Sequence, residues 1–361
     1  MRIMFFIPSM QAGGAERVMS VLANELIQRK VEVIIVMICN TKCEYPLSPE
    51  IKTICLSCDN DVHLVNIKRI FLRYRKIKES IREHQPDVVI SFMSNTNIDV
   101  CLSMIGVHIP VIVSERNDPA VDPSNKVRRL LRKVAYTRAN GFVFQTSNAR
   151  NYFGRRIRTK STIILNPLTK IPEIYKGTRT EKIVAVGRLE AQKNYPLLIN
   201  AFKMFLKHYP TFQLEIYGEG REREQLENII KVSEVQNSVK LCGYSSDVHE
   251  KIKDARCYVM CSDFEGMPNA LMEAMALGLP CISTDCPCGG PKMMIDDHEN
   301  GILIPVKNEK ALCDAMCFMV AESEASERMG RNAARIKEKT NVSCITDQWM
   351  AYINKVINSN Y

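Results

Sequence analysis

Short runs rich in apolar residues recur along the first half of the chain, and in most of them apolar and polar residues do not alternate. Such runs are typical of strands buried on both faces of a sheet, because a strand with one face in water alternates apolar and polar residues. In this half the pattern predicts strands at residues 3–7, 32–38, 51–56, 87–92, 110–115, 141–146 and 162–165.

Helical patterns separate several of these strands. Between residues 15 and 30, for example, Val18, Leu22 and Leu26 recur at a spacing that places them on one face of a helix. The alternation of strands and helices indicates βαβ units and therefore a parallel sheet.

A second series of apolar runs begins after the Asn166-Pro167 break and a polar link at residues 170–181. The strands predicted in this series span residues 182–186, 212–218, 239–243, 257–262, 280–284 and 301–306. A length of 361 residues suits two domains. We therefore predict an α/β protein with two doubly wound, Rossmann-like domains built on parallel sheets. We expect its ligand site outside the carboxyl ends of the strands, in the cleft where the domains face each other.

The composition, with 46% hydrophobic and 25% charged residues, is that of an ordinary globular protein. No apolar run reaches the roughly 18 residues of a membrane span, and the first run ends at Pro8, too early for a secretory signal. We therefore expect a cytoplasmic protein whose 14 cysteines are reduced thiols. Two cysteine pairs have a spacing that zinc can use, but they lie at the ends of predicted strands, and we expect no metal there. The pairs are Cys39/Cys43 and Cys55/Cys58.

The formal net charge of +9 arises in the first half of the chain. Residues 1–167 carry 25 basic and 14 acidic side chains, a net +11, whereas the remaining residues carry 24 and 26, a net −2. Much of the excess lies in a predicted amphipathic helix at residues 66–84, with further basic clusters at residues 126–133 and 155–160. Either the apolar stripe of this helix packs on the core beneath a solvated charged face, or the basic face meets an anionic membrane. Nucleic acid suits the sequence less well, because no recognition motif is present.

Two loops that follow predicted strands carry groups suited to an anion. Gly13 and Gly14 follow the first strand, where bare backbone and the amides of a helix start favour an anionic ligand, although an ordinary turn also explains them. Arg188 and Lys193 follow the first strand of the second series, where together they would clamp a diphosphate. Taken singly, these two cations are ordinary surface charges.

The most specific stretch lies at residues 261–280. Pro268 suits the first position of a helix, so Glu265 lies in the preceding loop and Glu273 in the second helical turn. We therefore expect different tasks for the two carboxylates. If no ligand binds there, the first is a charge at a helix start and the second part of a solvated face. Backbone amides at the positive end of the helix are available to hydroxyls or phosphate oxygens. They belong to Gly266, Met267 and Asn269.

Three segments, taken together and in their order along the chain, resemble the retaining glycosyltransferase family 4, whose members have the GT-B fold. They are GGAER at residues 13–17, VGRLEAQKN at residues 186–194 and EGMPNALMEAMALGLP at residues 265–280. Matching motifs continue to about residue 306, so the resemblance covers most of the chain. It is specific for the family and says little about the substrate.

The resemblance implies a role for each candidate residue. Arg188 and Lys193 would hold the donor diphosphate. Glu273 would bind the ribose hydroxyls, and Glu265 hydroxyls of the donor sugar. The glycine pair would close over the diphosphate, and the loop before the helix would support sugar and phosphates. The residues concerned are Gly13, Gly14, Gly266, Met267, Pro268 and Asn269.

The chain departs from the family at two places. Many members carry a histidine near the donor sugar, after the strand that matches residues 110–115, whereas Arg116 stands here. A guanidinium cannot act as a base near neutral pH but can hold phosphate or sugar oxygens, so we include Arg116 among the donor-binding residues. The loop at residues 286–293 lacks a glutamate that is common there in the family, so no role is carried over to it.

The last helix of the family usually crosses back to the first domain, and a helix is predicted at residues 346–357. We therefore expect an acceptor-binding domain of residues 1–167 together with residues 346–361. Residues 168–345 would form the donor-binding domain.

Two further motifs are not assigned to the site. Asp59-Asn60-Asp61 has the DxD form that other glycosyltransferases use for a metal, but a solvated turn explains it, and we predict no metal. Gly218-Glu219-Gly220 lacks the third glycine of a dinucleotide site and is expected to line the nucleotide side of the cleft.

The six histidines form no spaced cluster and are expected to be structural or at the surface.

Together with the resemblance, these features predict a retaining, metal-independent glycosyltransferase without a cofactor. We expect it at the inner face of the cell membrane, moving a hexose or N-acetylhexosamine from UDP to a lipid-linked oligosaccharide. Resemblance to bacterial surface-polysaccharide enzymes implies undecaprenyl diphosphate as the acceptor lipid. The alternatives are a sugar-nucleotide epimerase with the same fold and an inactive nucleotide-sugar-binding scaffold.

Overall fold

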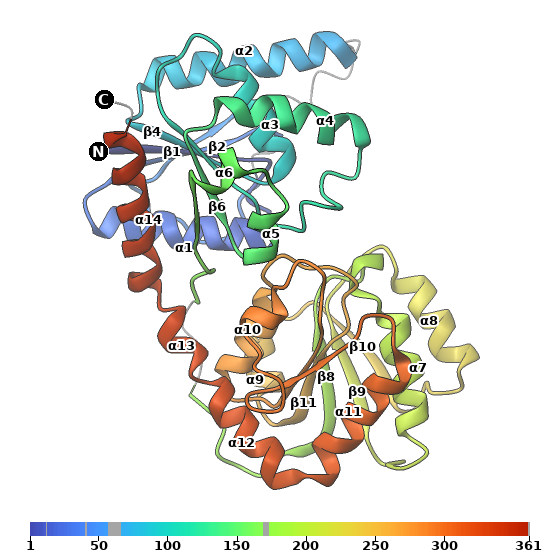
Figure 1. Cartoon of the computed structure of the whole chain (residues 1–361). Coiled ribbons are helices and arrows are strands. Elements are labelled where there is room, and N and C mark those ends of the chain that lie inside the picture. The colour runs from blue at the N-terminus through green and yellow to red at the C-terminus, as the bar shows by residue number, and fades with distance from the viewer. Residues whose placement is uncertain (12, 40–41, 57–65, 169–172, 360–361) are drawn as a thin grey trace. The chain divides into compact units, whose positions relative to one another are not determined.

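The computed structural model describes residues 1–11, 13–39, 42–56, 66–168 and 173–359. The chain divides into two compact units, each built on one sheet (Figure 1). Unit 1 comprises Met1–Thr169 and Thr340–Tyr361, and unit 2 comprises Lys170–Lys339.

The sheet of unit 1 has the order β3-β2-β1-β4-β5-β6-β7, and every neighbouring pair is parallel. The strand order reverses between β1 and β4, which is the arrangement of a doubly wound sheet. The strands are β1 (Arg2–Ile7), β2 (Glu32–Met37), β3 (Lys52–Cys55), β4 (Val88–Phe92), β5 (Val111–Ser114), β6 (Gly141–Phe144) and β7 (Ser161–Ile163).

The helices of unit 1 include one from the end of the chain. In Figure 1, α2, α3 and α4 lie together, and α14 packs beside α1. Trp349 of α14 stacks on Phe92 of β4, with the ring centroids 5.9 Å apart, so the last helix is part of the core. The helices are α1 (Gly14–Gln28), α2 (Asn66–His84), α3 (Ser94–Ser103), α4 (Lys126–Ala135), α5 (Ser147–Asn151), α6 (Arg155–Arg158) and α14 (Val342–Asn358), with the 3-10 turn η1 (Tyr136–Arg138).

The sheet of unit 2 has the order β10-β9-β8-β11-β12-β13 and is also parallel throughout. Its order reverses between β8 and β11. The strands are β8 (Thr180–Val186), β9 (Gln213–Tyr217), β10 (Val239–Gly243), β11 (Ala255–Met260), β12 (Cys281–Thr284) and β13 (Ile302–Ile304).

The helices of unit 2 bury one apolar face each against this sheet or against one another. They are α7 (Tyr195–Phe205), α8 (Arg223–Val232), α9 (Val248–Ile252), α10 (Asn269–Ala276), α11 (Glu309–Ala321), α12 (Ser323–Ala333) and α13 (Ile336–Lys339), with the 3-10 turns η2 (Ala191–Lys193) and η3 (Pro291–Met293).

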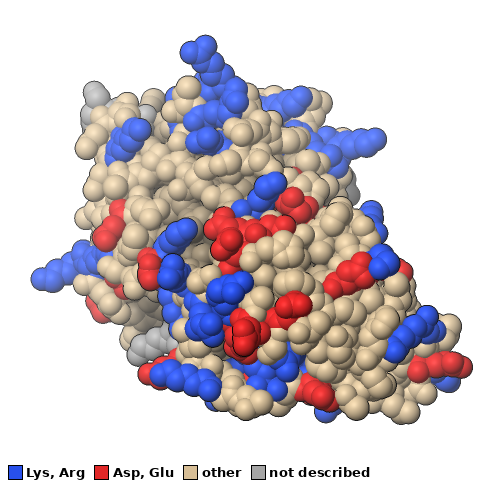
Figure 2. All heavy atoms as spheres, turned by 60° about the horizontal axis from the view of Figure 1, so that its bottom comes forward, with Lys and Arg blue, Asp and Glu red and all other residues tan. Residues whose placement is uncertain are grey.

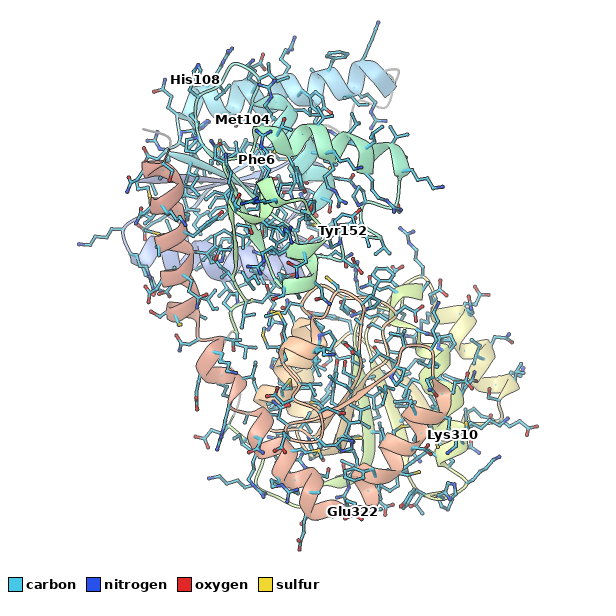
Figure 3. All side chains as sticks on the ribbon, in the orientation of Figure 1. Phe6, Met104, His108, Tyr152, Lys310 and Glu322 are labelled. Atoms are coloured by element: carbon cyan, nitrogen blue, oxygen red, sulfur yellow. The ribbon has the colours of Figure 1, made fainter. Side chains whose placement is uncertain are left out.

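Burial follows the apolar runs of the sequence. Phe6 of β1 is fully buried, whereas Lys310 and Glu322, also labelled in Figure 3, lie at the outside of unit 2. Basic and acidic side chains are interspersed over the lower part of the face shown in Figure 2, so charge is locally balanced there.

The fold prediction of two Rossmann-like domains with parallel sheets is confirmed, and so is the helix at residues 66–84. Two helix starts differ from prediction. Helix α10 begins at Asn269, and Pro268 is the extended residue before it rather than the first helical residue. Helix α14 begins at Val342 instead of residue 346, because the Asn341 side chain caps it by accepting from two backbone amides. Among the described helices, none is long and apolar enough to cross a membrane.

Candidate active site

Four of the charged residues predicted from the sequence lie after strands of the unit 2 sheet. Arg188 and Lys193 follow β8, and Glu265 and Glu273 follow β11. The strand order reverses between these two strands. Because doubly wound sheets bind ligands outside the carboxyl ends of their strands at such a reversal, this is the candidate site of unit 2.

Lys193 and Glu265 form an ion pair, with Nζ and Oε1 2.6 Å apart. The Ser262 hydroxyl donates to the same carboxylate oxygen over 2.9 Å. Glu265 is buried, and a buried carboxylate is costly unless it is paired and hydrogen-bonded. The cation therefore compensates the carboxylate, and the carboxylate holds the ammonium in one position. The sequence assigned these two residues to different parts of a ligand and did not predict their contact.

Hydrogen bonds join the loop after β8 to the loop after β11. The Asp263 amide donates to the Gln192 carbonyl over 2.9 Å, and the Gln192 side chain donates to a carbonyl of the second loop over 2.7 Å. The Asn194 side chain donates to the Asp263 carboxylate over 2.8 Å. Asn194 itself has a φ of 49°, a left-handed conformation that asparagine tolerates well. These bonds fix the position of Lys193 relative to Glu265.

Glu273 is buried in the second turn of α10, which excludes the solvated face as its environment. Nε2 of His249, on α9, lies 2.9 Å from Oε2 of Glu273. An ionised carboxylate only accepts hydrogen bonds, so in this contact Nε2 carries the proton. The sequence predicted that His249 is structural or at the surface and did not predict its contact with Glu273. No local pattern marks it, because the contact joins helices that follow different strands.

Glycines let the surrounding loops approach one another. A Cβ on Gly218, which has a φ of 143°, would lie 2.0 Å from the carbonyl oxygen of Gly187. A Cβ on Gly290 would lie 1.7 Å from the carbonyl oxygen of Gly266. The loop after β9 therefore packs on the loop after β8, and the loop after β12 packs on the one that precedes α10. Any side chain at these positions would force the loops apart.

Arg188 differs from its neighbours in having no protein partner for its guanidinium among the described residues. Its side chain is exposed. A planar cation that is held at a strand end and left unpaired is suited to an anion from solution, because its five donors match phosphate oxygens.

In unit 1, Gly13 is the extended residue before α1, with a φ of −169°. Its amide donates to the Tyr45 hydroxyl over 3.0 Å, and that hydroxyl donates to the Gly13 carbonyl over 2.9 Å. A Cβ on Gly13 would lie 2.2 Å from a carboxylate oxygen of Glu16. The sequence did not indicate Tyr45, which fixes the glycine turn from a distant segment. Gly14 is the first residue of α1.

Arg116 follows β5 in unit 1 and lies over the Phe92 ring, with Cζ 3.9 Å from the ring centroid. Its Nη1 donates to the Asn166 side chain over 2.9 Å, whereas Nε and Nη2 are buried and have no hydrogen-bond partner in the described structure. Aromatic faces replace oxygen acceptors on this side of the guanidinium. Burial lowers the pKa of Arg116 to about 9, and in the resolved surroundings no carboxylate pairs with it.

Next to Arg116, the Glu115 carboxylate lies in a closed polar network. It accepts hydrogen bonds from the Ser94 hydroxyl, over 2.8 Å, and from the Tyr136 hydroxyl. Nη1 of Arg132 lies 3.7 Å from Oε1 of Glu115. Burial raises the pKa of Glu115, against the opposing effects of these three neighbours. The sequence did not single out Glu115, because nothing local distinguishes it from an exposed loop carboxylate.

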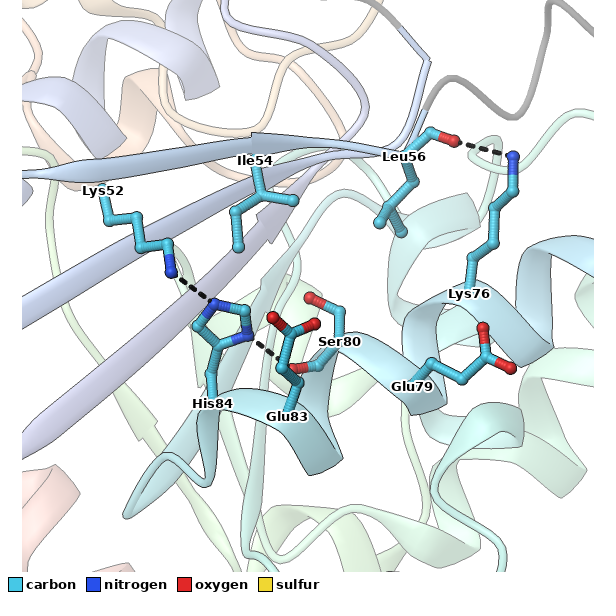
Figure 4. Close-up of a pocket in the computed structure, with 8 residues that line it drawn as sticks. All are labelled: Lys52, Ile54, Leu56, Lys76, Glu79, Ser80, Glu83 and His84. Carbon is cyan, nitrogen blue, oxygen red and sulfur yellow. Dashed lines mark hydrogen bonds between the residues drawn. The ribbon is translucent and has the colours of Figure 1, made fainter.

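A hollow of about 330 Å³ runs along the edge of unit 1, between β3 and α2 (Figure 4). Nζ of Lys52 lies 2.7 Å from Nε2 of His84, and Nζ of Lys76 donates to the Leu56 carbonyl over 3.0 Å. None of the residues predicted for the site lines this hollow.

In the part of the chain that the structure describes, no three His, Cys, Asp or Glu side chains gather as ligands of a metal would. The cysteines seen there are free thiols. Cys58 and the Asp59-Asn60-Asp61 motif lie outside the described residues.

Comparison with known families gives two matches that divide the chain between them. A family described as "Glycosyltransferase Family 4" matches residues 12–169, and one described as "Glycosyl transferases group 1" matches residues 169–336.

Two similar proteins come from Campylobacter jejuni. The first, a GalNAc-α-(1→4)-GalNAc-α-(1→3)-diNAcBac-PP-undecaprenol α-1,4-N-acetyl-D-galactosaminyltransferase, is 28% identical over 99% of this chain and 100% of its own length. The second, an N-acetylgalactosamine-N,N′-diacetylbacillosaminyl-diphospho-undecaprenol 4-α-N-acetylgalactosaminyltransferase, is 25% identical over 92% and 94%.

Solved structures share the fold over the whole chain. TarM has a TM-score of 0.82 at 15% identity and covers 98% of both chains. The lipopolysaccharide outer core galactosyltransferase WaaB has a TM-score of 0.75 at 22% identity and covers 100% of both. The two-unit architecture is therefore that of known GT-B glycosyltransferases.

Proposed function

The chain belongs to the group 1 and family 4 glycosyltransferases, and from this premise we propose that it moves a hexose or N-acetylhexosamine from UDP to a lipid-linked oligosaccharide. The observation that carries the proposal is the Lys193–Glu265 pair at the strand reversal of unit 2. An acceptor built on undecaprenyl diphosphate is supported by two relatives whose names contain that lipid. The acceptor would serve the synthesis of a bacterial surface polysaccharide.

Arg188 and Lys193 hold the donor diphosphate in this proposal. The diphosphate gains negative charge as the bond to the sugar breaks, so fixed cations beside it stabilise the transition state more than the ground state. The unpaired guanidinium of Arg188 supports this role. Lys193 contacts the phosphate while it keeps its bond to Glu265, since an ammonium has three donors.

The two carboxylates bind hydroxyl groups. Glu265 holds hydroxyls of the donor sugar, supported from the loop by Gly266, Met267, Pro268 and Asn269, while Glu273 accepts from the ribose. The His249 contact supports the second assignment, because it holds the Glu273 carboxylate in one position at the start of α10. We also propose donor-binding roles for Gly13, Gly14 and Arg116 of unit 1.

We infer retention of the anomeric configuration without a covalent enzyme intermediate. Glu265 already accepts from Lys193 and Ser262, which makes it a poor nucleophile. The acceptor then enters on the face that the diphosphate leaves, and the diphosphate takes its proton. Mass spectrometry of enzyme held with donor and a slow acceptor tests this. A glycosylated peptide that contains Glu265, absent in Glu265→Gln, would overturn the mechanism.

Metal independence is part of the same proposal. Two cationic side chains and the amides before α10 neutralise the diphosphate, so a divalent cation is redundant. Turnover is expected to survive EDTA unchanged. Activity that disappears on chelation and returns with magnesium or manganese would contradict this and direct attention to Asp59 and Asp61.

Unit 1 would bind the acceptor at the inner face of the cell membrane, in the cytoplasm, with the basic helix α2 against anionic lipid. Several α2 cations are engaged within the protein, because Arg73 pairs with Asp99 and Lys78 donates to a backbone carbonyl. Exposed basic residues remain at Lys68, Arg75 and Arg82. Charge reversal at these three is expected to weaken binding to anionic vesicles, most at low salt, with donor affinity unchanged.

The test of the function itself is donor-dependent product formation. A thermal-shift screen of nucleotide sugars first identifies the donor, and mass spectrometry then follows the mass of a lipid-linked acceptor. Donor binding without any transfer to acceptor would favour the nucleotide-sugar-binding scaffold instead.

A further inference from the structure

Helix α4 exposes its apolar residues. Four of them recur at the i, i+3, i+4 and i+7 spacing of one helix face. The exposed fractions are 66% for Val127, 64% for Leu130, 37% for Leu131 and 60% for Val134. Single exposed apolar residues need no explanation, but a contiguous ridge of them marks a surface that something covers. We call these four residues the α4 ridge.

The opposite face of α4 is held to the protein by arginines. Arg128 pairs with Asp99, which is almost completely buried. Arg129 donates to three backbone carbonyls of the preceding loop. Arg132 is buried and donates to the carbonyls of Asp122, over 2.7 Å, and Pro119, over 2.8 Å.

This arrangement reverses the usual one, in which the apolar face of a surface helix packs on the core. Rotating α4 to bury the ridge would take Arg128 from the buried Asp99 carboxylate and Arg132 from its two carbonyls, at a large cost. The ridge therefore faces outward as part of the fold. The sequence marked residues 126–133 only as a basic cluster, and it did not predict that three of the arginines in this cluster bind to the protein.

Helix α4 is basic beside the ridge, and helix α2, which meets the opposite face of α4, carries a further exposed apolar side chain. Arg73 of α2 binds the same Asp99 carboxylate over 3.0 Å, so the two helices converge there. Phe71, two residues away on α2, is 70% exposed. Lys126 and Lys133 of α4 are also exposed, and α4 contains no acidic residue.

We propose that the α4 ridge inserts into the boundary between headgroups and acyl chains of an anionic lipid bilayer. An apolar stripe flanked by exposed lysines matches an interface that is apolar below and negatively charged above. A second copy of this chain matches it less well, because the same lysines would repel each other across the contact. The inference rests on the proposed lipid-linked acceptor. It adds a hydrophobic contact of α4 with the membrane to the electrostatic contact proposed for α2.

The two contacts differ in how they respond to salt. Screening weakens the attraction of exposed charges, whereas burial of apolar side chains is little affected by moderate salt. Binding through α2 alone would disappear as salt rises. With the ridge inserted, a salt-resistant part of the binding remains.

The first experiment compares the full-length protein with a triple variant, Val127→Gln, Leu130→Gln and Val134→Gln, by co-sedimentation with vesicles of phosphatidylglycerol and phosphatidylcholine. Glutamine is a good helix former, so the fold is expected to persist, and circular dichroism checks this. The matched control is Val232→Gln on α8, a site that is 73% exposed in unit 2. We expect the triple variant to lose at least about tenfold in the salt-resistant partition coefficient, and the control none.

The second experiment places a reporter in the ridge. In Leu130→Trp the new indole adds to Trp349, which is buried in unit 1 and supplies a constant background. Insertion predicts a blue shift and quenching by brominated lipids in the variant, beyond that of the wild-type protein. Emission that shifts with protein concentration but is not quenched by lipid would identify a second copy as the occupant and overturn the inference.

The outcomes separate this inference from the proposed function. Transfer to a water-soluble acceptor analogue depends only on the chemistry, so the triple variant is expected to match the wild type there. If the wild type transfers sugar but the triple variant binds vesicles equally well, the ridge inference fails alone. If no nucleotide sugar supports transfer by the wild type, the proposed function fails, whatever the vesicles show.

Discussion

Both units carry charged residues at the carboxyl ends of their strands, yet they use them differently. In unit 1, Glu115 is enclosed by Ser94, Tyr136 and Arg132, and each of these contacts lies within the protein. In unit 2, Lys193 and Glu265 are paired, but Arg188 is exposed without a protein partner in the described structure. Groups whose contacts all lie within the protein belong to the fold, whereas an exposed cation without a protein partner is available to a ligand.

The largest effect is expected at Arg188. Arg188→Ala should lower turnover at saturating donor by a factor that corresponds to about 3–4 kcal/mol, because it removes a cation that acts on the leaving diphosphate. The unfolding temperature should stay the same, since the guanidinium is exposed. Steady-state kinetics and calorimetry give the two numbers. Turnover at the wild-type level would remove Arg188 from the site.

The opposite behaviour is expected at Arg132. Arg132→Met should destabilise unit 1 by about 3 kcal/mol, because it leaves two carbonyls without their buried donor and removes the cation beside the Glu115 carboxylate. The affinity of the folded protein for the nucleotide-sugar donor should not change. Chemical unfolding and a donor titration measure the two quantities. A variant that is as stable as the wild type but binds the nucleotide sugar poorly would show that Arg132 serves the ligand and not the fold.

A smaller effect is expected at His249, which we treat as a positioning residue for Glu273. His249→Ala should raise the donor KM by about tenfold, the equivalent of one hydrogen bond to a charged group, with less change in kcat. His249→Gln retains a donor and should recover part of the loss. If both variants shift KM equally, the hydrogen bond to Glu273 is not the cause.

The smallest effect concerns pH. Because burial raises the pKa of Glu115 above its value in the unfolded chain, its contribution to stability is full below about pH 4.5 and falls as the pH rises through the folded-state pKa. Glu115→Gln cannot titrate, so its stability relative to the wild type should increase across that range. Unfolding free energies at a series of pH values measure the difference. A constant difference between the two proteins would show that this carboxylate has an ordinary pKa.

The sequence predicted the fold because strands buried on both faces leave an unmistakable apolar pattern, as in β4 and β11. It predicted the unit 2 residues because a local motif carries them. It missed His249 and Tyr45, whose contacts join segments that are distant along the chain. It did not predict how the arginines of α4 are placed, because periodicity shows that a helix has two faces but not which of them packs on the core.

The central claim is that the strand-end site of unit 2 transfers a sugar from UDP with retention. The most direct measurement is nuclear magnetic resonance of the product formed by wild-type protein and by Arg188→Ala from a UDP-sugar and a short-chain, diphosphate-linked acceptor. We expect the wild type to form an α-linked product from an α-linked donor and Arg188→Ala to form almost none. A β-linked product, or equal product from the two proteins, would contradict it.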